Sequence, residues 1–224
     1  MRVFYFSCAL VLSLTVSAVG QQLPDGGGDT RAYLIFLNGA PIGREDVTIQ
    51  RDLQGVTIVT QARLGIPANV TTRRGEIRYR TDWTPERLTI DANINGTDLN
   101  LRTTFANGMA VSEGTSGSQP IAATDMIAPG TFVLPNVIFA SHEALGRRLA
   151  AAASNDELHA FVAPGLYIPF RIVSSTSDQI QTGTSTFPVR RYELRFGTGD
   201  NPLVMNLTTT AELMHYAFSN KLVI

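Results

Sequence analysis

Histidines and the single cysteine are the residues here that a transition metal would need, and their spacing does not favour a metal site. His142, His159 and His215 lie far apart in the chain, and none belongs to an H-x-x-x-H pair. Cys8 falls in an apolar N-terminal run. Zinc sites use three or four such ligands, often at short spacings. The sequence therefore predicts no metal, and we expect each histidine to be a surface or packing residue.

Serine nucleophiles and phosphate-binding loops leave short motifs, and this sequence carries neither in full. The string closest to a G-x-S-x-G elbow runs from Gly114 to Ser118 and lacks the final glycine, so we interpret it as a polar loop. The glycine run 26–28 precedes every strand that we predict, which does not match a dinucleotide-binding loop. The sequence thus predicts no catalytic residue and no cofactor.

Paired carboxylates are the chemistry of sugar hydrolysis, and four acidic residues could converge for it. These residues are Asp82, Glu86, Asp91 and Asp98. Each has a turn or solvent-facing position available, so we interpret them as surface residues. On the segment 69–80, alternate positions carry three arginines and a glutamate: Arg74, Glu76, Arg78 and Arg80. We interpret this as a solvated strand face with partly compensating charges, an anion-binding strip being the alternative.

The overall charge and apolar content exclude further classes. Eighteen basic residues against nineteen acidic ones leave a formal charge of −1. Such a chain has no basic field to attract a polyanion, so we expect no nucleic-acid partner. With 224 residues and 44% hydrophobic content, it is long and apolar enough to bury a sizeable core.

Residues 1–20 have the pattern of a secretory signal peptide. Arg2 gives a basic start, the segment 3–16 is almost entirely apolar, and Ala18 and Gly20 are small residues before a cleavage site. The apolar run is about 14 residues, shorter than the roughly 20 that a helix needs to span a bilayer. We expect cleavage before Gln21 and no integral membrane span afterwards, a retained anchor being the alternative.

Cleavage at that position would also determine the redox character of the mature chain. It removes Cys8, the only cysteine, so neither a thiol nor a disulfide is left. An exported protein without disulfides is typical of a bacterial envelope. We therefore expect a periplasmic or extracellular bacterial protein with a flexible lead-in over 21–30.

From Arg31 onward, the sequence alternates between apolar and polar residues, as antiparallel strands with one buried face do. The clearest examples are the segments 56–64, 88–94 and 99–105. Asn-Gly pairs at 38–39, 95–96 and 107–108 favour tight hairpin turns. This series of hairpins predicts an antiparallel meander. We interpret Trp83, two positions before Pro85, as an anchor at a strand end.

One helix interrupts the strands. Apolar residues recur at steps of three and four over 136–153, with Asn136 as the expected N-cap and Arg147 and Arg148 near the negative end of the helix dipole. Such an amphipathic helix should pack on the sheet or plug it. The strand pattern resumes after this segment.

We predict an all-β fold with one helix, formed by residues 31–224 as a single domain. About 10–14 antiparallel strands should curl into a barrel or a half-closed clam, because curling buries their edges. Buried-face side chains would line a candidate ligand cavity; those we select are Ile58, Ile90, Ile94, Leu101 and Phe105.

Four segments resemble a known family: Tyr33 to Val47, Arg73 to Tyr79, Leu134-Pro-Asn136 with Phe139, and Pro164 to Pro169. They resemble the β-rich N-terminal domain that precedes an α/β-hydrolase (S33-like peptidase or esterase) domain in some exported bacterial proteins. Stand-alone exported β-domains of unknown function look similar. The resemblance implies an accessory role without an active site, because that family's catalytic residues belong to the hydrolase domain. A stand-alone form and a truncated reading frame are both open.

These observations lead to one functional hypothesis and two alternatives. The hypothesis is an exported non-catalytic β-domain that binds an apolar small molecule or a partner protein. In the first alternative, the chain positions substrate for an α/β-hydrolase domain as the accessory part of a split or truncated enzyme. In the second alternative, it is a structural component of the cell envelope.

Overall fold

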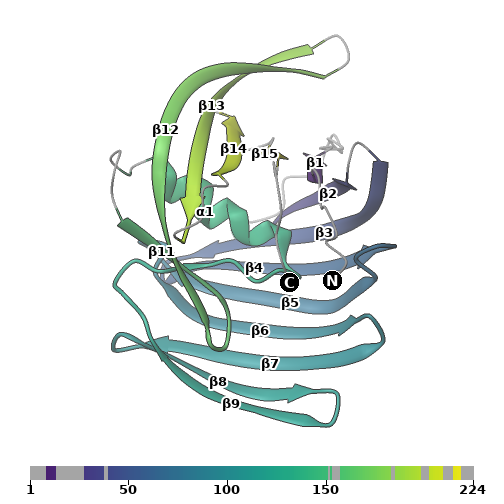
Figure 1. Cartoon of the computed structure of the whole chain (residues 1–224), viewed down its shortest axis with the longest axis vertical. Coiled ribbons are helices and arrows are strands. Elements are labelled where there is room, and N and C mark those ends of the chain that lie inside the picture. The colour runs from purple at the N-terminus through teal and green to yellow at the C-terminus, as the bar shows by residue number, and fades with distance from the viewer. Residues whose placement is uncertain are drawn as a thin grey trace.

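The computed structural model describes residues 9–13, 28–37, 40–150, 152, 157–182, 185–197, 202–208 and 214–217. Within these residues the chain forms two sheets and a short helix (Figure 1). The first sheet has nine strands and the second has six. This is the predicted all-β fold with one helix, and its curled sheets make it barrel-like.

The nine-stranded sheet is a meander in which each strand pairs antiparallel with the next along the chain. Its strands are β1 (Ala9–Ser13), β2 (Asp29–Leu37), β3 (Ala40–Asp52), β4 (Gly55–Leu64), β5 (Val70–Arg80), β6 (Pro85–Ile94), β7 (Thr97–Ala106), β8 (Met109–Ser116) and β9 (Gln119–Met126). The predicted meander is confirmed. β1 lies inside the predicted signal peptide, where it pairs with the segment 33–37 of β2. β2 begins at Asp29, inside the predicted flexible lead-in, because its first residues pair with β3.

Two of the three predicted Asn-Gly turns connect neighbouring strands of this sheet. Asn95 and Gly96 have φ of 51° and 86°, and Asn107 and Gly108 have φ of 53° and 72°. Positive φ at both central positions is what a tight hairpin of this kind requires. The third pair, at 38–39, lies outside the described residues.

The six-stranded sheet follows the helix along the chain. Its strands are β10 (Phe132–Val133), β11 (Glu157–Ala163), β12 (Leu166–Thr182), β13 (Ser185–Phe196), β14 (Pro202–Thr208) and β15 (Met214–Ala217). β10 pairs parallel with β11, and the other pairs are antiparallel. Figure 1 shows the long β12–β13 hairpin curving away from the nine-stranded sheet. The two sheets approach each other where β15 lies near β1.

The helical segment is shorter than predicted and starts later. A 3₁₀ turn, η1 (Phe139–Ser141), leads into α1 (His142–Leu149). Ile138 still has an extended backbone, so Asn136 is not the N-cap; Ser141 occupies that position. The sequence pattern extends further because the segment before the helix also buries apolar residues. Within the described residues, no helix is long and apolar enough to cross a bilayer.

One hydrophobic core joins both sheets and the helix. On β4 the residues Val56, Ile58 and Leu64 are buried in the predicted alternation. The helix contributes Leu145 and Leu149 to the same cluster, together with residues of β10 to β13. The predicted packing of the helix on the sheet is therefore confirmed.

Candidate functional site

The side chains that we selected as a cavity lining belong to this core. Ile58, Ile90, Leu101 and Phe105 are buried, and Ile94 is half-buried and packs against them. The ring of Phe105 meets that of Phe161 edge-on, at 5.2 Å between centroids, so a side chain from the second sheet occupies this space. The two hollows described below are lined by none of these five residues. A ligand cavity at these residues stays a prediction.

A buried carboxylate anchors the helical segment to the sheet. Glu45 of β3 has no exposed surface, and its Oε1 accepts a hydrogen bond of 2.6 Å from the Thr60 hydroxyl. Its two oxygens also accept the backbone N–H groups of Phe139 at 3.1 Å and Ala140 at 2.9 Å. Burial raises the pKa of Glu45 to about 7, against the lowering effect of these hydrogen bonds. The carboxylate thus takes up two N–H groups that the start of a helix leaves without partners.

A glycine lets the same segment approach the sheet closely. A Cβ on Gly75 of β5 would lie 2.7 Å from Cδ1 of Ile138 and 2.8 Å from Cγ2 of Thr60. Beside it, the Thr72 hydroxyl donates a 3.0 Å hydrogen bond to the carbonyl of Val137. The position of α1 over the sheet therefore depends on small and polar residues at the centre of β4 and β5.

His142 also belongs to this anchored segment. Its Nδ1 lies 2.9 Å from the carbonyl oxygen of Phe139, the residue whose N–H group binds Glu45. Burial lowers the pKa of His142 to about 4, so its ring is neutral at physiological pH. The predicted packing role of this histidine is confirmed.

An open hollow of about 440 Å³ lies where several segments meet near the C-terminal half of α1. Its lining comes from β2, the β3–β4 hairpin, the β5–β6 turn and α1. The lining residues are Arg31, Arg51, Asp52, Gly55, Val56, Thr81, Trp83 and Arg147. We call it the arginine hollow, and it is our candidate site because it gathers cationic groups and an aromatic ring in one concave place.

Two of the three arginines are held in position by one buried carboxylate. Arg31 lies 3.5 Å from one oxygen of Glu143, and Arg147 donates to the other oxygen at 3.2 Å. Arg31 also donates to Asp29, at 2.9 Å from Nε. Only 4% of the Glu143 side chain is exposed, so water screens these contacts little. Arg51 is exposed and makes no ion pair within the described part of the chain.

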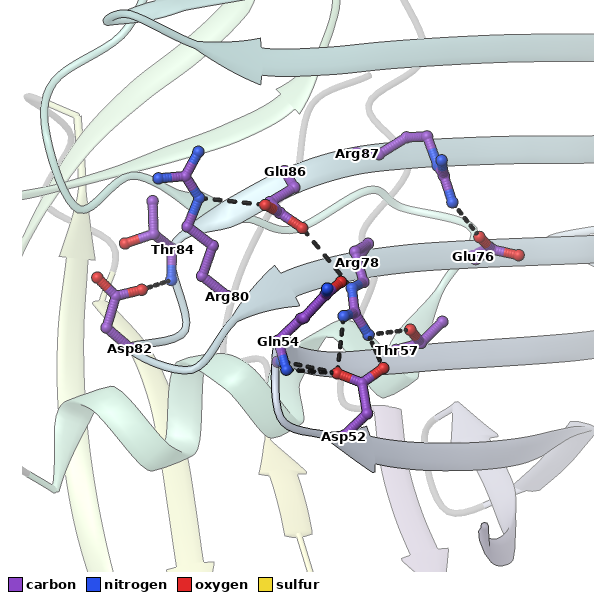
Figure 2. A network of polar contacts seen from close by, with 11 residues as sticks. Asp52, Gln54, Thr57, Glu76, Arg78, Arg80, Asp82, Thr84, Glu86 and Arg87 are labelled. Atoms are coloured by element: carbon purple, nitrogen blue, oxygen red, sulfur yellow. Dashed lines mark hydrogen bonds and ion pairs between the residues drawn. The ribbon is translucent and has the colours of Figure 1, made fainter. Parts of the chain in front are cut away.

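Asp52, the one carboxylate in the lining, already has a cationic partner. Both of its oxygens accept hydrogen bonds from Arg78, at 2.9 and 3.0 Å, and its Oδ1 accepts the N–H groups of Gln54 and Gly55. Figure 2 shows this arrangement, with Glu86 on the far side of Arg78. The hydrogen bonds from Arg78 lower the pKa of Asp52 well below its ordinary value. Asp52 is therefore ionised and paired outside the hollow.

Arg51 is the one cation of the lining without an acidic partner among the described residues. Arg31 and Arg147 contact Glu143, and Arg31 also binds Asp29. The carboxylate of Asp52 pairs with Arg78, which Glu86 also contacts.

Trp83 provides an aromatic wall of the hollow. It lies in the β5–β6 turn with φ of 64°, a left-handed conformation that is uncommon for a large side chain. Its N–H group donates to the carbonyl of Arg80, and its half-buried ring packs on Tyr79 at 5.7 Å between centroids. The predicted strand-end anchor is confirmed. The sequence did not reveal that this anchor also borders the hollow.

The four acidic residues that we considered for sugar chemistry separate into two groups, each engaged locally. Asp91 and Asp98 both bind Arg73, at 2.6 and 3.1 Å. Asp82 accepts the Thr84 N–H in the β5–β6 turn, and Glu86 pairs with Arg80 (Figure 2). These contacts match the predicted surface roles.

The charged face of β5 also behaves as predicted. Arg74 binds Glu76 at 2.5 Å, and Glu76 accepts a further contact from Arg87 of β6 at 2.9 Å. Together with the pairs of Arg78 and Arg80, these contacts confirm a solvated face with compensating charges.

His159 does not belong to the lining of the hollow. His159 stacks on Tyr167, with 5.0 Å between ring centroids, and lies 3.3 Å from Glu157. The side chain of His215 lies outside the described residues. In the part of the chain that the structure describes, no three histidine, cysteine or acidic side chains come together as a metal-binding group.

A second hollow, of about 570 Å³, lies on the β12–β13 hairpin. It is lined by Ser177, Asp178, Gln179, Pro188, Val189 and Arg190. Its one cation, Arg190, donates to Ser175 at 2.7 Å and stays on the hairpin itself. This hollow gathers neither several cations nor an aromatic ring, so it is the weaker candidate.

Comparisons with known proteins add a fold neighbour. A solved structure described as a beta-barrel-like protein of the domain of unknown function DUF1849, from Brucella abortus, aligns with 98% of this chain and 98% of its own. The TM-score is 0.48 and the sequence identity is 9%. No protein-family model matches the sequence, and no curated protein matches it.

Proposed function

We propose that this chain is an exported, non-catalytic domain that binds a partner protein or a small ligand at the arginine hollow. The observation that carries the proposal is a concave site lined by three arginines, of which Arg51 is exposed and makes no ion pair within the described residues. Because Glu143 holds Arg31 and Arg147 in place, binding would cost little side-chain ordering. Export is proposed from the signal-peptide pattern of residues 1–20.

The surface next to the hollow supports contact with a larger partner. Leu53, at the tip of the β3–β4 hairpin, is 99% exposed and adjoins the lining residues Arg51 and Asp52. The fully buried centre of a protein interface is more apolar than the rest of the surface, so an exposed leucine beside a charged site offers apolar area for such a contact. Binding of an apolar small molecule in the barrel interior has less support, since Ile58 and Phe105 pack within the core.

A site-specific photo-crosslinker at position 53 tests the location of binding. Ile66 is the matched control, because it is 87% exposed but lies in the β4–β5 loop, at the other end of β4. In cells that express the full chain, we expect a discrete crosslinked product from position 53 and none from position 66. Equal labelling from both positions, or none from position 53, would contradict the proposal.

Two further measurements test the remaining parts of the proposal. N-terminal sequencing of the mature protein should begin at Gln21, and the protein should lie outside the cytoplasm. Purified residues 21–224 should not turn over ester or peptide substrates. Robust turnover by this chain alone would contradict a non-catalytic role. Stimulation of a hydrolase encoded beside it would instead favour the accessory-domain alternative.

A further inference from the structure

We infer that the arginine hollow binds a singly charged carboxylate carried by a compact apolar group. This inference rests on the proposed binding function and specifies the ligand chemistry of the same site. The carboxylate would belong to a small acid or to an acidic residue presented by a partner. Three features carry the inference: the geometry of the arginines, the charge balance, and the apolar wall.

The arginines are arranged to receive an oxyanion. Glu143 accepts hydrogen bonds from Nε and Nη2 of Arg147 and lies 3.5 Å from Arg31, which also donates to Asp29. Both side chains are therefore held in place at the wall of the hollow. Arg147 is 42% exposed, so its free N–H groups are accessible. Arg51 adds a third cation that no acidic residue of the described chain neutralises. Guanidinium groups suit carboxylates because two parallel N–H donors match two oxygens.

The charge balance favours a ligand with one negative charge. Arg51 is the one lining cation without an acidic partner among the described residues, and a single carboxylate would neutralise it. A dianion such as a phosphate monoester would bring its second charge close to Asp29, Asp52 and Glu143. The same acidic residues disfavour a polyanion such as nucleic acid.

The remaining lining favours an apolar group next to the carboxylate. The Trp83 ring and the Val56 side chain form part of the wall, and Gly55 adds backbone without a side chain. Trp83 keeps this position through a left-handed backbone conformation, and strained conformations of this kind cluster at functional sites. A volume of about 440 Å³ lies within the usual range for small-molecule sites.

The chain contains a built-in reporter for this site, because Trp83 is its only tryptophan. Titration of the purified full-length chain with phenylacetate, followed by tryptophan fluorescence, should give a saturable change. Phenylacetamide, which has the same ring without the charge, should bind at least about tenfold more weakly, since a charge-assisted contact is lost. Acetate, which lacks the ring, should also bind more weakly.

Two substitutions localise the response. Arg51→Ala should weaken phenylacetate binding about tenfold. Arg102→Ala is the matched control, because Arg102 is exposed on β7 and makes no ion pair within the described residues. It should leave binding unchanged. Trp83→Asn keeps a residue that tolerates positive φ and removes the ring; binding to this variant, followed by NMR line broadening of phenylacetate, should also weaken.

The outcomes distinguish this inference from the broader proposal. Equal binding of phenylacetamide and phenylacetate, or no effect of Arg51→Ala, would overturn the carboxylate site. Displacement of phenylacetate by inorganic phosphate at equal concentration would also overturn it, in favour of a general anion site. If no probe binds but position 53 still forms its specific crosslink, the inference fails and the proposed binding function stands.

Discussion

Glu45 and Asp52 are carboxylates on the same strand, yet their surroundings shift their pKa values in opposite directions. Glu45 is fully buried and accepts hydrogen bonds only from a hydroxyl and two backbone N–H groups, so burial raises its pKa. Asp52 is exposed, and the guanidinium of Arg78 lowers its pKa. The interior carboxylate anchors the fold, whereas the exposed one balances charge beside the arginine hollow.

The two surroundings separate residues that hold the fold together from residues at the proposed binding site. Around Glu45, the hydroxyl of Thr60 and the two backbone N–H groups already bind the carboxylate, and no cation is involved. These groups are therefore not available to bind a ligand. The hollow is lined by three arginines and one aspartate, and Arg51 and Arg147 are exposed to solvent. Substitutions at the two places should therefore have unequal effects on folding, and the following experiments test that expectation.

The largest effect should come from removing the anchor. Glu45→Ala leaves the Thr60 hydroxyl and the N–H groups of Phe139 and Ala140 without their acceptor, which should lower the free energy of unfolding by about 3 kcal/mol. Urea denaturation measures this loss. Glu113→Ala, at an exposed position on β8, is the control and should stay close to wild type. Equal stability of the two variants would show that the buried hydrogen bonds do not hold the helix.

The second effect is a pH dependence with two opposing parts. The pKa of Glu45 rises from 4.5 to about 7 on folding, so its contribution to stability is lost as pH rises over that range. Asp46 adds to this shift. The pKa of His142 falls from 6.5 to about 4, so its contribution is lost as pH falls over that range. Each amounts to at most about 3 kcal/mol, and between pH 4.5 and 6.5 they oppose each other.

Single variants should separate the two parts. In Glu45→Gln the free energy of unfolding should rise with pH between 4 and 6.5, because only His142 is left. In His142→Gln it should fall between pH 4.5 and 7, because only Glu45 is left. Denaturation midpoints measured at several pH values provide the test. Parallel profiles for the two variants would mean that other groups control the pH response.

The third effect concerns the close approach of the helical segment. Gly75→Ala would place a methyl group against Ile138 and Thr60, which should cost about 1–3 kcal/mol through overpacking. Gly65→Ala is a suitable control, since the nearest atom to its Cβ would be 3.6 Å away. A crystal structure of Gly75→Ala should show Ile138 displaced from β5. Unchanged stability and an unmoved Ile138 would contradict the tight contact.

The smallest effect on folding should come from the hollow. Asp52→Ala removes an exposed acid whose contacts are screened by water, so its Tm should be hard to separate from wild type. The same variant should bind phenylacetate more tightly, because it removes the one carboxylate of the lining, which repels the ligand. Fluorescence titration alongside thermal unfolding checks both expectations. A large loss of stability would place Asp52 with Glu45 as a folding anchor.

Local patterns in the sequence predicted most of the nine-stranded sheet. Alternation on β4 and β6, and the turns at Asn95 and Asn107, depend on neighbours within a few residues, and the structure confirms them. The end of the helix was predicted too late, since α1 stops at Leu149 rather than near residue 153. Apolar periodicity alone does not reveal where hydrogen bonding ends.

The candidate site could not be predicted in the same way. The contacts of Glu45 join residues 94 and 95 positions apart, and no short motif reports such a pairing. The hollow brings Arg31 to within 3.5 Å of Glu143, which is more than a hundred positions away in the sequence. The arginines of the lining look like ordinary surface residues until the fold gathers them.

The pairing of β1 with β2 has a consequence for biogenesis. Residues 9–13 form the centre of the apolar run that an export machinery would have to recognise, yet in the folded precursor they add a strand to the sheet. Folding and recognition would then compete for the same five residues. If the precursor folded before it reached the translocase, its signal sequence would be paired in the sheet and inaccessible to the export machinery. If the chain is exported as we propose, translocation must be faster than folding. Cleavage before Gln21 would then remove β1 and leave the strand edge at Tyr33 to Leu37 without that partner.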